Sequence, residues 1–156
     1  MPESPAQRAM LDVWANHMHA LVTLKDPDAA LQTMTEEPSI FCVAAAKGAT
    51  GRDGVRSSYD KALRTVPADL EFFTLFQILN SDRLVEEFGV RFTDHGLFQE
   101  LVLLAVVQFQ NGRIDSAHYL WAHPRFREEP DIREEPDNAP RVPSAPRAAA
   151  LARISA

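Results

Sequence analysis

The chain has 156 residues, 46% of them hydrophobic, which is enough for one core but too little for two full domains. Its formal net charge is −6, and no Lys/Arg cluster with interleaved aromatic residues precedes the C-terminal region, so no nucleic-acid partner is expected. The single cysteine, Cys42, excludes an intramolecular disulfide and a thiolate metal cluster. Since the chain shows no secretory signal and no bilayer-length apolar run, we expect a cytoplasmic protein without membrane contact.

The first half of the chain predicts helices and one short strand. Apolar residues over Ala6–Leu24 recur at the spacing of an amphipathic helix. Asp26, followed by proline, is typical of an N-cap, so a second short helix is expected over Asp26–Met34. A short strand over Ser39–Val43 follows. After a glycine-rich stretch, we expect a third helix over Asp53–Arg64.

The second half predicts four consecutive antiparallel strands. Strand-like runs cover Leu70–Leu79 and Arg83–Thr93, separated by residues that favour turns. The segment Gln99–His123 then predicts a hairpin of two long strands. Asn111 and Gly112 form its turn, because this pair tolerates the positive φ values of a type I′ turn.

Helices that precede a run of antiparallel strands indicate an α+β fold. We expect a cone-shaped, curved antiparallel sheet packed on three N-terminal helices and enclosing a pocket, formed by residues 1–124. Residues 125–156 form a charged, proline-rich tail or arm, in which the unit Arg-Glu-Glu-Pro-Asp occurs twice. We interpret the repeated acid pairs as a solvated linker rather than a metal site.

Two histidines are candidates for chemistry. His17 lies on the apolar stripe of the first helix, where it is either a core histidine satisfied by one hydrogen bond or a base facing a cavity. Strict two-residue alternation in the last strand places His118 on one face with Ile114 and Ser116, and His123 on the other. His118 is therefore the second candidate for the pocket.

Carboxylates offer further candidates. In the strand after Arg83, Glu87 shares a face with Arg91, while Glu86 shares the opposite face with Phe88, and either carboxylate could be a pocket acid. For Glu87 we favour a surface ion pair with Arg91. Asp26 could act as a base at the pocket mouth, although we favour the interpretation as a helix cap.

The segment from Met10 to Pro124 contains short motifs whose order and spacing are more specific than any one of them. They are Trp14-x-x-His17, Asp26-x-Asp28, Leu31-x-Thr33-Met34-x-x-Glu37-Pro38, Gly51-Arg-Asp-Gly-Val-Arg56 with Tyr59, Leu84-Val-Glu-Glu87, and Val106-Val-x-Phe-x-Asn-Gly-Arg-Ile114 followed by His118 and Trp121. In this order the motifs resemble the nuclear transport factor 2-like superfamily, in its SnoaL-like branch.

This resemblance implies a mainly apolar pocket in a protein that commonly forms a homodimer, here through the sheet. Catalytic members are cyclases, isomerases, dehydratases and epoxide hydrolases that use general acid and base groups without a cofactor, and other members only bind ligands or partners. Together with the residue patterns, this resemblance gives the catalytic candidates His17, His118, Glu87 and Asp26. The substrate-binding candidates are Trp14, Tyr59, Phe73, Phe88 and Trp121, and no metal site is expected.

Three departures from the family pattern keep two functions open. Leu21 and Ala122 stand where related sequences carry carboxylates, and the segment 94–98 is a shortened loop. The first hypothesis is a cofactor-independent cyclase, isomerase or dehydratase acting on a small apolar molecule. The alternative is a non-catalytic ligand-binding or dimeric interaction module with the same fold.

Overall fold

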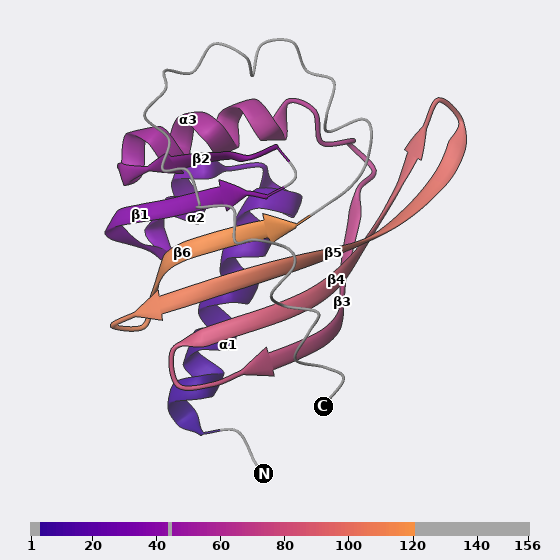
Figure 1. Ribbon diagram of the computed structural model, residues 1–156. Coiled ribbons are helices and arrows are strands. Elements are labelled where there is room, and N and C mark those ends of the chain that lie inside the picture. The colour runs from indigo at the N-terminus through magenta and orange to yellow at the C-terminus, as the bar shows by residue number, and fades with distance from the viewer. Residues whose placement is uncertain (1–3, 44, 121–156) are drawn as a thin grey trace, which may run out of the picture.

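The computed structural model describes residues 4–43 and 45–120, so Trp121, His123 and the predicted tail lie outside the described residues. A six-stranded sheet has the order β2-β1-β6-β5-β4-β3, and α1 crosses one of its faces (Figure 1). The elements are α1 (Pro5–Met18), the π-helix η1 (His19–Leu24), α2 (Pro27–Gln32), β1 (Met34–Cys42), β2 (Lys47–Thr50), α3 (Gly51–Leu63), β3 (Glu71–Leu79), β4 (Arg83–Asp94), β5 (Leu97–Gln110) and β6 (Arg113–Leu120).

The predicted first helix is divided into α1 and η1. Ser4 begins α1 with a capping box, in which its hydroxyl accepts from the Gln7 backbone and the Gln7 side chain accepts from the Ser4 backbone. The π-helix η1 ends at Leu24, and its C-cap residue Lys25 has a φ of 53° and donates from Nζ to the carbonyls of Val66 and Pro67 at 3.2 Å. None of the helices in the described ranges combines the length and the apolarity needed to cross a membrane.

The region after α1 differs from the sequence prediction in two places. The second helix ends at Gln32, and β1 begins at Met34 and runs through Pro38, where a register irregularity accommodates the missing N–H. The glycine-rich stretch contains the short strand β2 rather than only irregular chain. Gly48 is required there, because a Cβ would lie 2.8 Å from the Ile40 carbonyl oxygen.

The sheet is antiparallel at its predicted hairpins, but β1 pairs with β6 in parallel, so the sheet is mixed. The predicted turn is confirmed, since Asn111 and Gly112 have φ values of 52° and 75°. A second tight turn, at His95 and Gly96 with φ values of 48° and 79°, joins β4 to β5 within the segment expected to be a loop.

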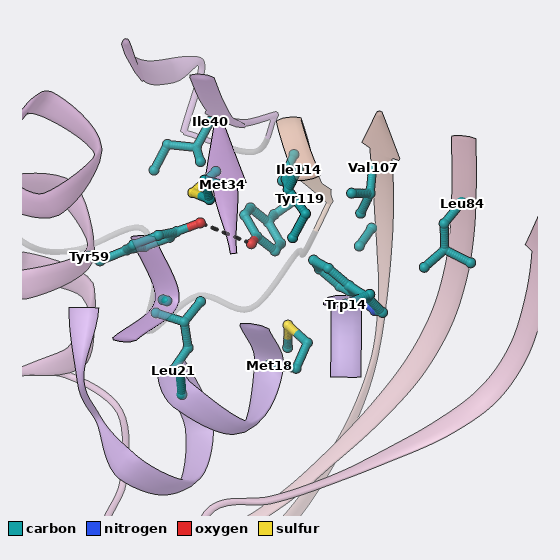
Figure 2. Packing of buried hydrophobic residues seen from close by; sticks show 14 of the residues in the cluster. Trp14, Met18, Leu21, Met34, Ile40, Tyr59, Leu84, Val107, Ile114 and Tyr119 are labelled. Carbon is teal, nitrogen blue, oxygen red and sulfur yellow. Dashed lines mark hydrogen bonds between the residues drawn. The ribbon is translucent and has the colours of Figure 1, made fainter. Parts of the chain in front are cut away.

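The core lies between the helices and the inner face of the sheet. Along β4, alternate residues from Leu84 to Phe92 point inward and are buried. Figure 2 shows how side chains from α1 and η1 meet side chains from the sheet in this layer. The labelled members are Trp14, Met18, Leu21, Met34, Ile40, Tyr59, Leu84, Val107, Ile114 and Tyr119. Together these findings confirm the α+β cone with N-terminal helices.

Candidate functional site

A β-bulge determines which side chains of β6 face the interior. Ile114 pairs with Phe109, whereas Ser116 pairs with Gln108, so Asp115 is an extra residue that shifts the alternation. Beyond the bulge, Ala117 and Tyr119 are buried.

The prediction that His118 faces a pocket is therefore wrong. Its side chain is exposed on the outer face, with its ring centroid 5.9 Å from that of Phe41. The error has a clear physical cause, because strict alternation was continued across a bulge that the sequence does not signal. Tyr119 occupies the interior position that had been assigned to His118.

His17 lies at the centre of a buried hydrogen-bonded network that joins α1, α2, α3 and β6. Its Nε2 is 3.1 Å from the Tyr59 hydroxyl and 3.4 Å from the Tyr119 hydroxyl, and these two hydroxyls are 3.3 Å apart (Figure 2 shows the tyrosine pair). Its Nδ1 is 2.8 Å from Thr33 Oγ1 and 3.3 Å from the Ala30 carbonyl oxygen. The imidazole is 0% exposed.

The network assigns the tautomer of His17. The Thr33 hydroxyl donates its proton to the Ala30 carbonyl at 2.7 Å, so Thr33 Oγ1 must accept from His17 Nδ1–H. His17 Nε2 is then the acceptor, and the nearest donor is the Tyr59 hydroxyl, which in turn can accept from Tyr119. The result is a directional chain of donors from Tyr119 through Tyr59 to His17.

Burial keeps every member of this chain neutral near pH 7. Desolvation lowers the pKa of His17 from 6.5 to about 4, despite the opposing hydrogen bond with Ala30. Desolvation also raises the pKa of Tyr119 to about 12 and that of Tyr59 well above its usual value. The imidazole is thus available as a base, and the phenols are available as donors.

A second buried cluster surrounds Glu86 on β4, which is 1% exposed. The Trp14 indole Nε1 donates to Oε2, while Thr74 Oγ1 and Gln77 Nε2 donate to Oε1 at 2.7 and 2.9 Å. Trp14 also stacks on His17, with ring centroids 5.5 Å apart. Trp14 therefore connects the two clusters.

The structure places the remaining predicted residues as follows. Glu87 points to the outer face, where it pairs with Phe76 and Leu104, so it is not an interior acid. Glu86 is the interior carboxylate. Asp26 caps α2, accepting from the backbone N–H groups of Asp28 and Ala29 at 3.0 and 3.1 Å, which explains it as a cap. Its side chain is on the surface, away from the interior network.

Of the predicted binding residues, Trp14, Tyr59 and Phe88 lie in the interior. Phe73 does not, because it lies on the outer face over Gly89, with the Arg91 guanidinium 4.4 Å from its ring centre. The interior partners Tyr119 and Thr33 were not selected from the sequence, although Thr33 falls within a motif of the resemblance.

A surface groove on α3 has a volume of about 340 Å³ and contains none of the predicted residues. Within it, Arg56 is bound to Asp28 at 2.6 and 2.9 Å, and this hydrogen bonding lowers the pKa of Asp28. The pair links α3 to α2. The lining residues are Asp53, Arg56, Ser57, Asp60, Lys61 and Arg64.

Comparison with protein-family models and with curated proteins finds no match. Solved structures do match. An NTF2-like protein from Anabaena variabilis ATCC 29413 is 11% identical with a TM-score of 0.67, covering 79% of this chain and 95% of that one. A protein from Jannaschia sp. CCS1 that is assigned as a SnoaL-like polyketide cyclase is 11% identical with a TM-score of 0.63, covering 76% of this chain and 89% of that one.

A third similar structure is SalBIII, an epoxide hydrolase/cyclase-like enzyme in pyran ring formation in the polyether salinomycin. It is 16% identical with a TM-score of 0.60, covering 74% of this chain and 92% of that one. At these identities the likeness defines the fold. The chain has the nuclear transport factor 2-like cone fold of SnoaL-like proteins, as the resemblance of its sequence motifs predicted.

Proposed function

We propose that the protein is a cofactor-independent enzyme that uses general-base chemistry on a small apolar molecule carrying a hydroxyl group. The observation that carries this proposal is the directional chain Tyr119–Tyr59–His17. Because His17 Nδ1 already donates to Thr33, the chain accepts a proton at Tyr119 and delivers it to Nε2.

The proposed proton transfer involves only the substrate and the side chains of Tyr119, Tyr59 and His17. The substrate hydroxyl donates to Tyr119, whose own proton moves to Tyr59 while the Tyr59 proton moves to His17 Nε2. Both phenols are regenerated, and the proton reaches His17 only as the substrate oxygen forms its new bond, because burial disfavours a charged imidazole. In a cyclisation, the hydroxyl oxygen attacks an epoxide carbon while it loses its proton, one epoxide C–O bond breaks, and the proton returns along the chain to the epoxide oxygen, which becomes a hydroxyl group. The overall reaction is an isomerisation.

Tyr119 is the substrate-contacting member of the chain. Its hydroxyl is the terminal donor of the chain, 3.3 Å from the Tyr59 hydroxyl and 3.4 Å from His17 Nε2, so a ligand hydroxyl that donates to Tyr119 joins the chain at this end. Two proteins with this fold support the reaction class, because one is assigned as a polyketide cyclase and the other is an epoxide hydrolase/cyclase-like enzyme. The catalytic candidates are thus Tyr119, acting with Tyr59 and His17.

The test is turnover of an apolar epoxy alcohol to its cyclic ether, followed by chromatography of the isomers. Replacing Tyr119→Phe or His17→Gln should lower the rate by about 100-fold or more, as expected for the loss of a general base. His118→Ala is the matched control, since His118 lies on the outer face and should leave the rate unchanged. Wild-type rates in both Tyr119→Phe and His17→Gln would contradict the proposal.

A non-catalytic binding or interaction module is the second candidate. The observation that favours it is that both His17 nitrogens are fully engaged by groups of the chain itself, in a core without exposure of the imidazole. This candidate predicts that Tyr59→Phe and Tyr119→Phe change stability only. It is rejected if either variant abolishes turnover while its thermal unfolding stays within a few degrees of wild type.

We also propose that the protein forms a homodimer through the outer face of the sheet. This face exposes apolar side chains on β3 and β5, including Phe76, Ile78 and Val102, each more than half exposed. Isolated apolar residues are ordinary on a surface, but a contiguous apolar sheet face is typical of an interface. A second copy of the same face is the partner that we expect.

A further inference from the structure

Glu86 is a buried carboxyl group without a cationic partner in the described residues. His17 and Glu86 are the buried ionisable side chains besides the tyrosines in the ranges 4–43 and 45–120, and His17 is neutral near pH 7. The three partners of Glu86 all donate hydrogen bonds to it, and all three are uncharged side chains. Within these ranges no Lys or Arg forms an ion pair with it.

The two carboxylate oxygens differ in their access to the surface. Oε2 accepts from Trp14, which is buried in α1. Oε1 accepts from Thr74 and Gln77, whose residues are exposed on the edge strand β3. Oε1 is therefore separated from solvent by a single layer of hydrogen-bonded side chains.

A bulge in β3 creates this arrangement. Thr74 pairs with Phe88 and Phe76 pairs with Glu87, so Leu75 is an extra residue between them. As a result Thr74 and Gln77, which are three residues apart, both reach the same carboxylate oxygen. The bulged edge strand has no further strand on its outer side in the described sheet, so its side chains can rearrange without breaking a second ladder.

We propose that Glu86 is a binding subsite for the ammonium group of a small apolar amine. The ammonium N–H groups replace Thr74 and Gln77 on Oε1 and supply the cationic partner that this buried carboxyl group lacks. The apolar part of the ligand packs beside Phe88, which shares the inner face with Glu86, and Phe72, whose ring centroid lies 5.0 Å from that of Phe88. A ligand carboxylate is excluded by repulsion from Glu86.

This inference rests on the proposed function only in taking the cone interior as the ligand site, and it names the class of ligand. The test uses 2-phenylethylamine, 2-phenylethanol and 3-phenylpropionate, which share an apolar body and differ in the terminal group. Their affinities for the full-length protein at pH 7 are measured by calorimetry. We expect the amine to bind at least tenfold more tightly than the alcohol and the carboxylate to show no binding. Equal affinities for the amine and the alcohol would overturn the subsite.

Substitutions of Glu86 and of its hydrogen-bond donors test whether Glu86 binds the amine. Glu86→Gln should weaken amine binding at least tenfold and leave the affinity for the alcohol unchanged. Thr74→Val and Gln77→Leu keep Glu86 and remove its competing donors, so each should strengthen amine binding several-fold. Gln108→Leu, on the outer face of β5, is the matched control for Gln77→Leu and should have no effect. If neither Thr74→Val nor Gln77→Leu strengthens amine binding, the subsite is refuted even where Glu86→Gln fails to fold.

Different experimental results would refute the amine subsite and the proposed reaction. Amine binding that depends on Glu86, together with epoxy-alcohol turnover that is unaffected by Tyr119→Phe, would refute the proposed reaction and retain the subsite. Turnover that depends on Tyr119, together with no preference for the amine, would refute the subsite and retain the reaction.

Discussion

The Tyr59 hydroxyl lies 3.1 Å from Nε2 of His17, and this hydrogen bond joins α3 to α1 inside the core. Thr33 fixes the opposite side of the same ring, so the imidazole is held in one tautomer by two different elements. A neutral, oriented imidazole deep in an apolar layer stabilises the fold only while it remains uncharged. The stability of the protein should therefore report directly on this side chain.

Acid should destabilise the protein through His17. Its pKa is lowered from 6.5 in the unfolded chain to about 4 in the folded protein, so the unfolded chain binds more protons between these values. The stabilisation is present above pH 6.5 and is lost as the pH falls toward 4, amounting to roughly 3 kcal/mol. Urea unfolding of wild type and His17→Gln at pH 7.5 and pH 4.5 measures it. Between these pH values the wild type should lose more unfolding free energy than His17→Gln, which has no imidazole to protonate. Equal losses in the two proteins would contradict the lowered pKa of His17.

Tyr59→Phe should destabilise the protein by about 1–3 kcal/mol, because a buried acceptor loses its donor. The lower part of this range is expected if the Tyr119 hydroxyl, now 3.4 Å from Nε2, moves in to donate. Urea unfolding at pH 7.5 provides the value, with the exposed Ser57→Ala on the same helix as the control. A change no larger than that of Ser57→Ala would mean that the hydrogen bond contributes nothing to stability.

Gly89→Ala should destabilise the protein by about 1–3 kcal/mol through overpacking. A Cβ at this position would lie 2.1 Å from the Phe73 ring, which covers the glycine on the outer face. Combining the change with Phe73→Ala should cost less than the sum of the two single variants, as unfolding of all three proteins can determine. Gly54→Ala is the control, because its Cβ meets nothing closer than 3.8 Å and alanine favours a helix. It should be neutral or stabilising.

Phe76→Asp should convert the proposed dimer to a monomer, because it places a charge in an apolar interface. Sedimentation velocity across a hundredfold range of concentration measures the change. Leu24→Asp is closely matched, since Phe76 and Leu24 are both 56% exposed, but Leu24 lies at the end of η1 rather than on the sheet. A wild-type protein that sediments as a monomer throughout, or equal effects of the two variants, would exclude dimerisation through this face.

The sequence predicted the local features whose causes are local. Asp26 before a proline predicted the cap of α2, and Asn111 with Gly112 predicted the turn between β5 and β6. The period of the apolar residues placed α1 and the strand β4, because a helix face or a strand face repeats at a fixed interval along the chain. His17 was likewise placed correctly on the buried stripe of its helix.

The tertiary structure alone decided which polar groups meet. Asp115 and Leu75 are the extra residues of two β-bulges. Each bulge changes which side chains of the following strand point inward, and neither residue type predicts a bulge. The first bulge exchanged His118 for Tyr119 in the interior, and the second brought Thr74 and Gln77 together on Glu86. Strand register depends on pairing between distant segments, so the composition of the buried site follows from the sheet as a whole and not from any one stretch of sequence.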